Sequence, residues 1–132
     1  MLPIVIVLVL ATAFGVRYKR MSGRILVKSD KGVITESMIG AALGSRVTLA
    51  QFSSAFCSPC RATRMLLEDV TEDMSDVVYV EIDAEANLEL VRQLDIRSTP
   101  TTLFLDRDGH EVGRAMGAPK RDQVLSAISA IR

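Results

Sequence analysis

Two cysteines, Cys57 and Cys60, are the only ones in this chain of 132 residues, and they stand three positions apart. On a helix, side chains three positions apart face each other with Cβ atoms about 5–6 Å apart, and a disulfide needs roughly 3.5–4.5 Å. A slightly tightened first helical turn closes that difference, so the pair can form and open a disulfide without a large motion. The spacing therefore indicates reversible thiol–disulfide chemistry.

Other uses of two cysteines fit this chain poorly. The multi-bridge framework of a small secreted domain needs more cysteines than two. A structural zinc site needs four ligands, and the single histidine, His110, stands fifty residues after Cys60. A disulfide across so short a loop would also stabilise the fold only slightly. We therefore expect a redox pair, with no metal and no cofactor.

The residues around this pair predict a strand that runs into it and a helix that begins at it. Val47 to Phe52 is a nearly continuous apolar run, which fits a buried central strand. Pro59 suits the first turn of a helix, where a missing N–H costs nothing. A helix N-terminus favours a thiolate and can lower a thiol pKa from about 8.5 to about 3.5–7.5. We therefore expect Cys57 to be the exposed nucleophile and Cys60 the resolving thiol.

The helix after the cysteines is predicted from Cys60 to Met74, because apolar residues recur there at helical spacing with acidic residues between them. Its expected inner positions are Ala62, Met65, Leu66, Leu67, Val70 and Met74. A second buried strand is expected from Val77 to Ile82. Asn87 is expected to cap a short helix. The expected inner positions of that helix are Leu88, Val91 and Leu94.

The last third of the chain predicts a hairpin and a final helix. Thr101 to Leu105 and Glu111 to Met116 are expected to pair around a turn at 106–109. A helix then follows, with Pro119 expected in its first turn. Its expected apolar face consists of Val124, Leu125, Ile128 and Ile131.

Weaker elements precede the cysteines: a strand near 24–27, a polar turn at 28–32, and a short helix between Ile34 and Leu43 that stops at Gly44. The helices between the first main strands imply right-handed crossovers and a parallel portion of the sheet, and the hairpin adds antiparallel strands. The order of elements predicts an α/β fold with a central mixed β-sheet flanked by helices, preceded by an N-terminal apolar helix.

These residues resemble the thioredoxin superfamily over about residues 45–132. The resemblance lies in the run from Phe56 to Arg61, in the run from Ile96 to Thr101, and in the turn at Asp108-Gly109. It implies a thioredoxin-like fold and a thiol–disulfide oxidoreductase. The run from Ser98 to Thr102 looks most like the membrane-tethered branch of that superfamily.

The resemblance also implies which residues bind a substrate. In that superfamily the proline equivalent to Pro100 is cis and lies beside the disulfide, and the backbone before it, here at Thr99, pairs with the substrate. The other expected substrate-binding residues flank the thiols: Phe56, Ser58 and Pro59. The implied partners are protein disulfide or thiol substrates and an upstream thiol reductant.

Three positions depart from the usual pattern of the superfamily. Phe56 replaces a tryptophan, and the residues between the cysteines are Ser-Pro rather than Gly-Pro. The buried aspartate that relays protons falls at Gln51, and its lysine partner falls at Tyr79. Because glutamine cannot titrate, Cys60 must lose its proton by another route. We therefore expect slower turnover, and we expect the substitution Gln51→Asp to speed disulfide reduction.

The N-terminal segment from Leu2 to Val16 carries no charged residue. Fifteen helical residues span roughly 22 Å, against a hydrocarbon core of about 30 Å. A transmembrane anchor, a signal peptide and a buried core helix all remain open. An anchor is favoured because no basic region precedes the run and because the run is apolar on every face. Five basic residues between 17 and 28 then predict a single-pass membrane protein with its soluble domain on the cytoplasmic side.

The domain boundaries follow from this charge pattern. Residues 1–18 are expected to be the anchor, 19–32 a basic linker, and 33–132 the thioredoxin-like domain. Residues 29–132 hold 11 basic and 16 acidic residues, a net charge of −5. A nucleic-acid-binding domain would carry a basic face instead, so we expect no nucleic-acid partner.

The sequence favours a membrane-anchored thiol–disulfide oxidoreductase that reduces protein disulfides. Two alternatives stay open. One is a redox-silent thioredoxin-fold module that holds a partner at the membrane, since one fold hosts many functions. The other is an extracytoplasmic thiol reductase of the cytochrome-maturation type. The side of the membrane on which the domain lies distinguishes the extracytoplasmic reductase from the favoured function, because the reducing pool of the cytoplasm favours a reductase there.

Overall fold

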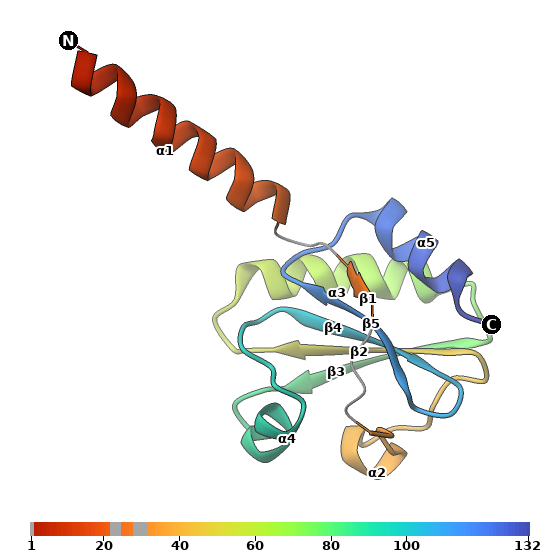
Figure 1. The fold of residues 1–132 in the computed structure, drawn as a ribbon. Coiled ribbons are helices and arrows are strands. Elements are labelled where there is room, and N and C mark those ends of the chain that lie inside the picture. The colour runs from red at the N-terminus through yellow and green to blue at the C-terminus, as the bar shows by residue number, and fades with distance from the viewer. Residues whose placement is uncertain (1, 22–24, 28–31) are drawn as a thin grey trace.

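The structure of the protein is a computed structural model that describes residues 2–21, 25–27 and 32–132 (Figure 1). The helices are α1 (Leu2–Met21), α2 (Glu36–Ile39), α3 (Ser58–Thr71), α4 (Leu88–Gln93) and α5 (Arg121–Ala130). The strands are β1 (Ile25–Val27), β2 (Val47–Ser53), β3 (Val77–Asp83), β4 (Thr101–Asp106) and β5 (Glu111–Met116). The expected order of elements is confirmed.

The strands form one mixed sheet in the order β1-β5-β4-β2-β3. β2 pairs with β3 in parallel, so that Gln51 lies beside Glu81. β2 also pairs with β4 in antiparallel orientation, and this places Thr102 opposite Gln51. Since β2 has a partner on each side and helices above and below, all seven of its residues are buried. The apolar run before the cysteines therefore forms the centre of the fold.

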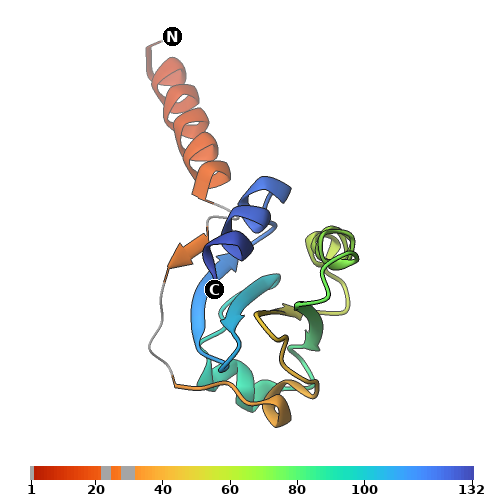
Figure 2. The ribbon, with the colours of Figure 1, turned by 90° about the vertical axis from the view of Figure 1, so that its right-hand side faces the viewer.

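Helices cover both faces of this sheet, and one hydrophobic core lies on each face. α3 and α5 lie over one face, whereas α2 and α4 lie over the other (Figures 1 and 2). Side chains alternate along β2, so Leu49 joins the core under α3 and α5, and Phe52 joins the core on the opposite face. The layered α/β architecture is as predicted.

The inner face of α3 differs from the prediction. The helix begins at Ser58, two residues earlier than expected, and Ala62 and Met65 are exposed. The side chains buried against the sheet are Cys60, Thr63, Leu67 and Val70. Their spacing of three, four and three residues follows one helical stripe. Thr63 was not expected there because it is polar.

Three further helix details are corrected. In α4, Leu88 is exposed and Leu90 is buried. The Asn87 side chain donates to the Asp83 carbonyl instead of capping the helix. α2 ends at Ile39 with Gly40 as its C-cap, at a left-handed φ of 72°, rather than stopping at Gly44. α5 begins at Arg121 with Lys120 as its N-cap. Pro119 therefore precedes the helix and is not in its first turn.

The N-terminal region is partly described. β1 confirms the strand expected near 24–27 and pairs with β5. Residues 22–24 and 28–31, which belong to the expected linker at 19–32 and include most of the expected turn at 28–32, lie outside the described residues. Every described side chain of α1 is exposed, so the core-helix interpretation is wrong. From Leu2 to Arg20 the helix is long and apolar enough to cross a membrane, and Figure 1 shows it projecting from the sheet domain.

Candidate active site

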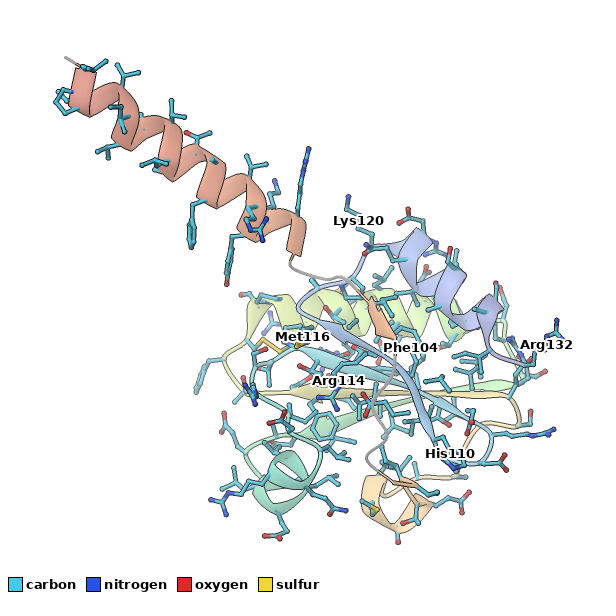
Figure 3. The ribbon with its side chains drawn as sticks, in the orientation of Figure 1. Phe104, His110, Arg114, Met116, Lys120 and Arg132 are labelled. Atoms are coloured by element: carbon cyan, nitrogen blue, oxygen red, sulfur yellow. A yellow bond between two sulfur atoms is a disulfide. The ribbon has the colours of Figure 1, made fainter. Side chains whose placement is uncertain are left out.

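The two cysteines form a disulfide at the N-terminal end of α3 (Figure 3). Their Cα atoms are 5.2 Å apart. Cys57 is the N-cap residue of α3, and its Sγ accepts the backbone N–H of Cys60 at 3.1 Å. Cys57 is half-buried, whereas Cys60 is only 2% exposed. This asymmetry gives one sulfur that a partner can reach and one that is enclosed behind it.

A groove of about 540 Å³ opens over the disulfide. It is lined by residues of the β2–α3 junction, of α3 and of the carboxyl end of β3, among them Ser53, Phe56, Cys57, Ser58, Cys60, Arg64 and Glu81. The carboxyl ends of parallel strands meet at one edge of a sheet, so β2 and β3 deliver their last residues to the same place. The groove is therefore built by the parallel pair of strands and the helix that follows it.

Two of the residues expected to bind a substrate, Phe56 and Ser58, line this groove. The ring of Phe56 is fully exposed, with a relative exposure of 103%. Ser58 and Pro59 in the first turn of α3 are also exposed. An apolar ring held in water next to a reactive sulfur is suited to contact a partner, since aromatic side chains contribute strongly at interfaces.

Thr99 and Pro100 come from the connection before β4. Their peptide bond is cis, as the resemblance implied. The Thr99 hydroxyl lies 3.1 Å from the Ser54 hydroxyl, and Ser54 lines the groove. Pro100 is buried, and its carbonyl accepts the N–H of Gly117 at 2.8 Å. The fold thus brings Thr99 to the loop that carries the cysteines, although they are far apart in the sequence.

Gln51 lies fully buried beneath the disulfide and makes three hydrogen bonds. Its Nε2 donates to the Cys60 carbonyl at 2.9 Å and to the Ser53 hydroxyl at 3.0 Å. Its Oε1 accepts the Tyr79 hydroxyl at 2.7 Å. Because a carbonyl can only accept, the Cys60 contact fixes which end of the amide faces the disulfide. The amide therefore holds the first turn of α3 against the sheet.

The hydrogen bonds continue from Ser53 to a carboxylate. The Ser53 hydroxyl donates to Oε2 of Glu81 at 3.3 Å, and the Arg64 guanidinium lies 3.5 Å from Oε1 of Glu81. Glu81 lines the groove together with Cys60. The sequence interpretation missed Ser53 and Glu81. The available signal was the alternation of side chains along a strand, which puts Gln51 and Ser53 on one face.

Tyr79 remains a protonated phenol. Burial raises its pKa well above the ordinary value, and the nearby carboxylates of Glu81 and Glu68 raise it further. A protonated phenol is a firm donor to the Gln51 carbonyl oxygen. Behind this cluster, the hydroxyls of Thr63 and Thr102 are buried without a hydrogen-bond partner among the described residues.

His110 lies away from this site. Figure 3 shows it at the opposite end of the sheet from the disulfide, in the β4–β5 hairpin. Its ring nitrogen is 3.5 Å from Asp106. Oδ1 of Asp106 accepts the backbone N–H groups of Asp108 and His110. The Asp106 carboxylate therefore stabilises the hairpin turn, and Gly109 supplies the positive φ of 85° that the turn requires.

Comparison with known proteins agrees with this geometry. The family model described as Thioredoxin matches residues 35–130. Thioredoxin H5 from Oryza sativa subsp. japonica is 28% identical over 100 residues, which cover 76% of this chain and 73% of the relative. A thioredoxin from Chlamydia trachomatis serovar D is 27% identical over 97 residues, which cover 74% of this chain and 94% of the relative.

A solved structure shows the same fold. The X-ray structure of Fasciola hepatica thioredoxin superposes with a TM-score of 0.60 at 25% sequence identity, and the match covers 67% of this chain and 84% of that one. The fold is therefore the thioredoxin-like fold, and its close cysteine pair is the redox centre that this fold presents. The chain belongs to the thioredoxin family of thiol–disulfide oxidoreductases.

Proposed function

We propose that this protein is a membrane-anchored reductase of protein disulfides. The observation that carries the proposal is the asymmetry of the pair. Cys57 is accessible at the N-cap of α3, where a backbone N–H points at its sulfur. Cys60 is enclosed. An N–H directed at a sulfur stabilises the thiolate that is the attacking species.

The reaction proceeds by two exchanges. The Cys57 thiolate attacks one sulfur of the partner disulfide, a bond forms between them, and the other partner sulfur leaves as a thiolate. Cys60 then loses its proton and attacks Sγ of Cys57. The Cys57–Cys60 disulfide forms while the bond to the partner breaks, and the partner leaves with two thiols. The partner gains two electrons, and an upstream thiol reductant returns them to the cysteine pair.

The partner is held by the rim of the groove. Phe56 contributes an exposed apolar ring, and Ser58 and Pro59 offer an exposed first turn. The backbone at Thr99 pairs with an extended partner segment beside the disulfide. This assignment follows from the family resemblance and from the Ser54–Thr99 contact, which brings Thr99 to the loop that carries the cysteines.

The apolar helix α1 anchors the protein. Residues 1–18 form the anchor and residues 33–132 the redox domain, and the expected linker at 19–32 contributes β1 to the sheet of that domain. Support comes from the length and hydropathy of Leu2–Arg20 and from Lys19 and Arg20 in the last turn of the helix. Basic residues at one end of a span favour the cytoplasm, so the redox domain faces the cytoplasm.

A trapping experiment in membranes tests this function. With Cys60→Ser in the full chain, partner proteins should remain bound to Cys57 as mixed disulfides that a thiol reductant releases. The control is the double variant Cys57→Ser/Cys60→Ser, which should trap nothing. A C-terminal reporter active only in the cytoplasm tests the side of the membrane.

The buried amide of Gln51 keeps a second function open, because it cannot relay a proton. If Cys60→Ser traps no more protein than the double variant, the domain is a redox-silent binding module. If trapping occurs but the cytoplasmic reporter is inactive, the protein is an extracytoplasmic thiol reductase.

A further inference from the structure

In the proposed reduction Cys60 attacks as a thiolate, so its proton needs an acceptor. The residue buried directly behind it is Gln51, whose amide takes up no proton near neutral pH. Tyr79, the next group in the network, is a protonated phenol because burial raises its pKa. Neither residue can accept the proton. The acceptor must therefore lie elsewhere in the surroundings of Cys60.

The side-chain hydrogen bonds behind the disulfide all point in one direction. Tyr79 donates to Gln51, and Gln51 donates to the Ser53 hydroxyl. Since the oxygen of Ser53 accepts from the amide, its own hydrogen is free to donate, and it does so to Oε2 of Glu81. A chain of donors needs an acceptor at its end, and here that end is a carboxylate.

Glu81 is placed to take a proton from the groove. It lines the groove together with Cys60, and 35% of its side-chain surface is exposed. Ser53 holds one carboxylate oxygen and Arg64 lies near the other. The carboxylate is thus held at the groove by contacts from β2 and α3.

We propose that Glu81 accepts the proton of Cys60 and that Ser53 and Arg64 hold the Glu81 carboxylate in position. This assignment rests on the proposed reductase function. The Cys60 S–H bond breaks, its proton passes to the Glu81 carboxylate across the groove that both residues line, and the Cys60 thiolate attacks Sγ of Cys57. The partner sulfur leaves as a thiolate, and Glu81 then releases the proton to the solvent or to that leaving thiolate.

Other charged groups near Glu81 come from two elements. From α3 these are Arg61, Arg64 and Glu68, and from β3 they are Asp83 and the neutral phenol of Tyr79. Asp83 also lines the groove, but one of its oxygens accepts the backbone N–H groups of Glu85 and Ala86. Glu68 is an exposed residue of α3 and does not line the groove.

The test isolates the attack by Cys60. The reduced full chain in a non-ionic detergent is mixed rapidly with an aromatic disulfide whose thiolate is coloured. The first thiolate is released when Cys57 is attacked, and the second is released when Cys60 resolves the mixed disulfide. The rate of this second phase is measured across neutral and mildly alkaline pH for wild type, Glu81→Gln, Glu81→Asp and the charge-matched control Glu68→Gln.

We expect Glu81→Gln to slow the second phase at neutral pH by at least about tenfold, since general acid–base catalysis contributes about 10²–10⁴-fold and solvent replaces part of it. The second-phase rate of Glu81→Gln should then rise in proportion to the hydroxide concentration. Glu81→Asp should restore most of the rate, and Glu68→Gln should stay within about twofold of wild type, as expected for an exposed charge screened by water.

Two results would overturn the assignment while leaving the reductase function intact. One is a second phase of Glu81→Gln with the rate and pH profile of wild type. The other is an equal slowing of the second phase by Glu81→Gln and Glu68→Gln, which would mean that the rate depends on the net charge of the protein and not on Glu81 itself. If wild type releases only one thiolate per chain, the reductase function itself fails, and the role of Glu81 falls with it.

Discussion

The Tyr79 hydroxyl donates a hydrogen bond of 2.7 Å to Oε1 of the fully buried Gln51. The amide then directs its nitrogen to the Cys60 carbonyl. Two neutral side chains therefore occupy the position behind the enclosed cysteine. The Gln51 amide supports the first turn of α3 but cannot accept a proton. The proposed proton acceptor is therefore Glu81, at the edge of the groove.

The first prediction concerns the pH dependence that Tyr79 gives to stability. Burial raises its pKa in the folded state, while the unfolded chain loses the phenol proton near pH 10. Below about pH 10 the stabilisation by Tyr79 is fully present, and it is lost as the pH rises from there towards the folded pKa. Tyr79→Phe lacks the hydrogen bond, so wild type should be more stable at neutral pH by about 1 kcal/mol.

Urea unfolding of both proteins across this pH range measures the difference. The advantage of wild type should shrink above about pH 10. The difference in phenolate absorbance between the two proteins reports Tyr79 alone, and it should appear only as the fold is lost. An advantage that stays constant or grows with pH would contradict the assignment of a protonated, half-buried phenol.

The second prediction concerns a carboxylate behind Cys60. Gln51→Asp should speed the attack by Cys60, because a titrating group would then lie under the enclosed thiol. It should also destabilise the fold by about 1–3 kcal/mol, since an ionised carboxylate cannot donate to the Cys60 carbonyl or to the Ser53 hydroxyl. Desolvation raises the pKa of such a buried carboxyl, so this protein should lose stability as the pH rises above about 4.

The control for this experiment is Gln51→Asn, which has the size of aspartate but does not titrate. Its resolution rate should not exceed that of wild type. Equal rates for the Asp and Asn variants would show that the substitution acts through packing rather than proton transfer. Rates are measured as the second thiolate release, and stability as urea unfolding.

The third prediction concerns Phe56. Its ring is exposed on all sides, so Phe56→Ala should leave the free energy of unfolding unchanged within about 0.5 kcal/mol. The same substitution should lower kcat/KM for a protein disulfide by about tenfold, because the loss of one interface contact costs about that much. It should leave kcat/KM for a small aromatic disulfide unchanged, because such a substrate does not reach the ring. The matched control is Met65→Ala, which removes another exposed apolar side chain of this region, on the solvent side of α3. Equal effects of the two variants would contradict a docking role for Phe56.

Much of this architecture could be predicted from local patterns in the sequence. The apolar run of β2 and the position of Pro59 placed Cys57 at a strand-to-helix junction, because strand burial and helix starts depend on nearby residues. The phase of α3 was harder. One inward position of the helix is occupied by the polar Thr63, so the apolar Ala62 and Met65 were assigned to the wrong face.

The hydrogen-bond chain could not be predicted in the same way. Gln51 is 28 residues from Tyr79, and Ser53 is 28 residues from Glu81. These contacts depend on the register between two parallel strands, which the crossover through α3 sets in three dimensions. The sequence showed that Gln51 cannot titrate, but only the register of β2 and β3 shows which carboxylate lies at the end of the chain.

The fourth prediction compares two threonines buried in adjacent strands. The hydroxyl of Thr48 accepts the N–H of Gly44 at 2.8 Å, whereas the hydroxyl of Thr102 has no partner among the described residues. Valine keeps the branched shape of threonine and its fit to a strand. Thr48→Val should therefore cost about 1–2 kcal/mol, and Thr102→Val should stabilise the fold by about 1 kcal/mol, because an unpaired buried hydroxyl is costly. Urea unfolding of both variants in one detergent provides the comparison, and a destabilised Thr102→Val would mean that this hydroxyl is hydrogen-bonded in solution.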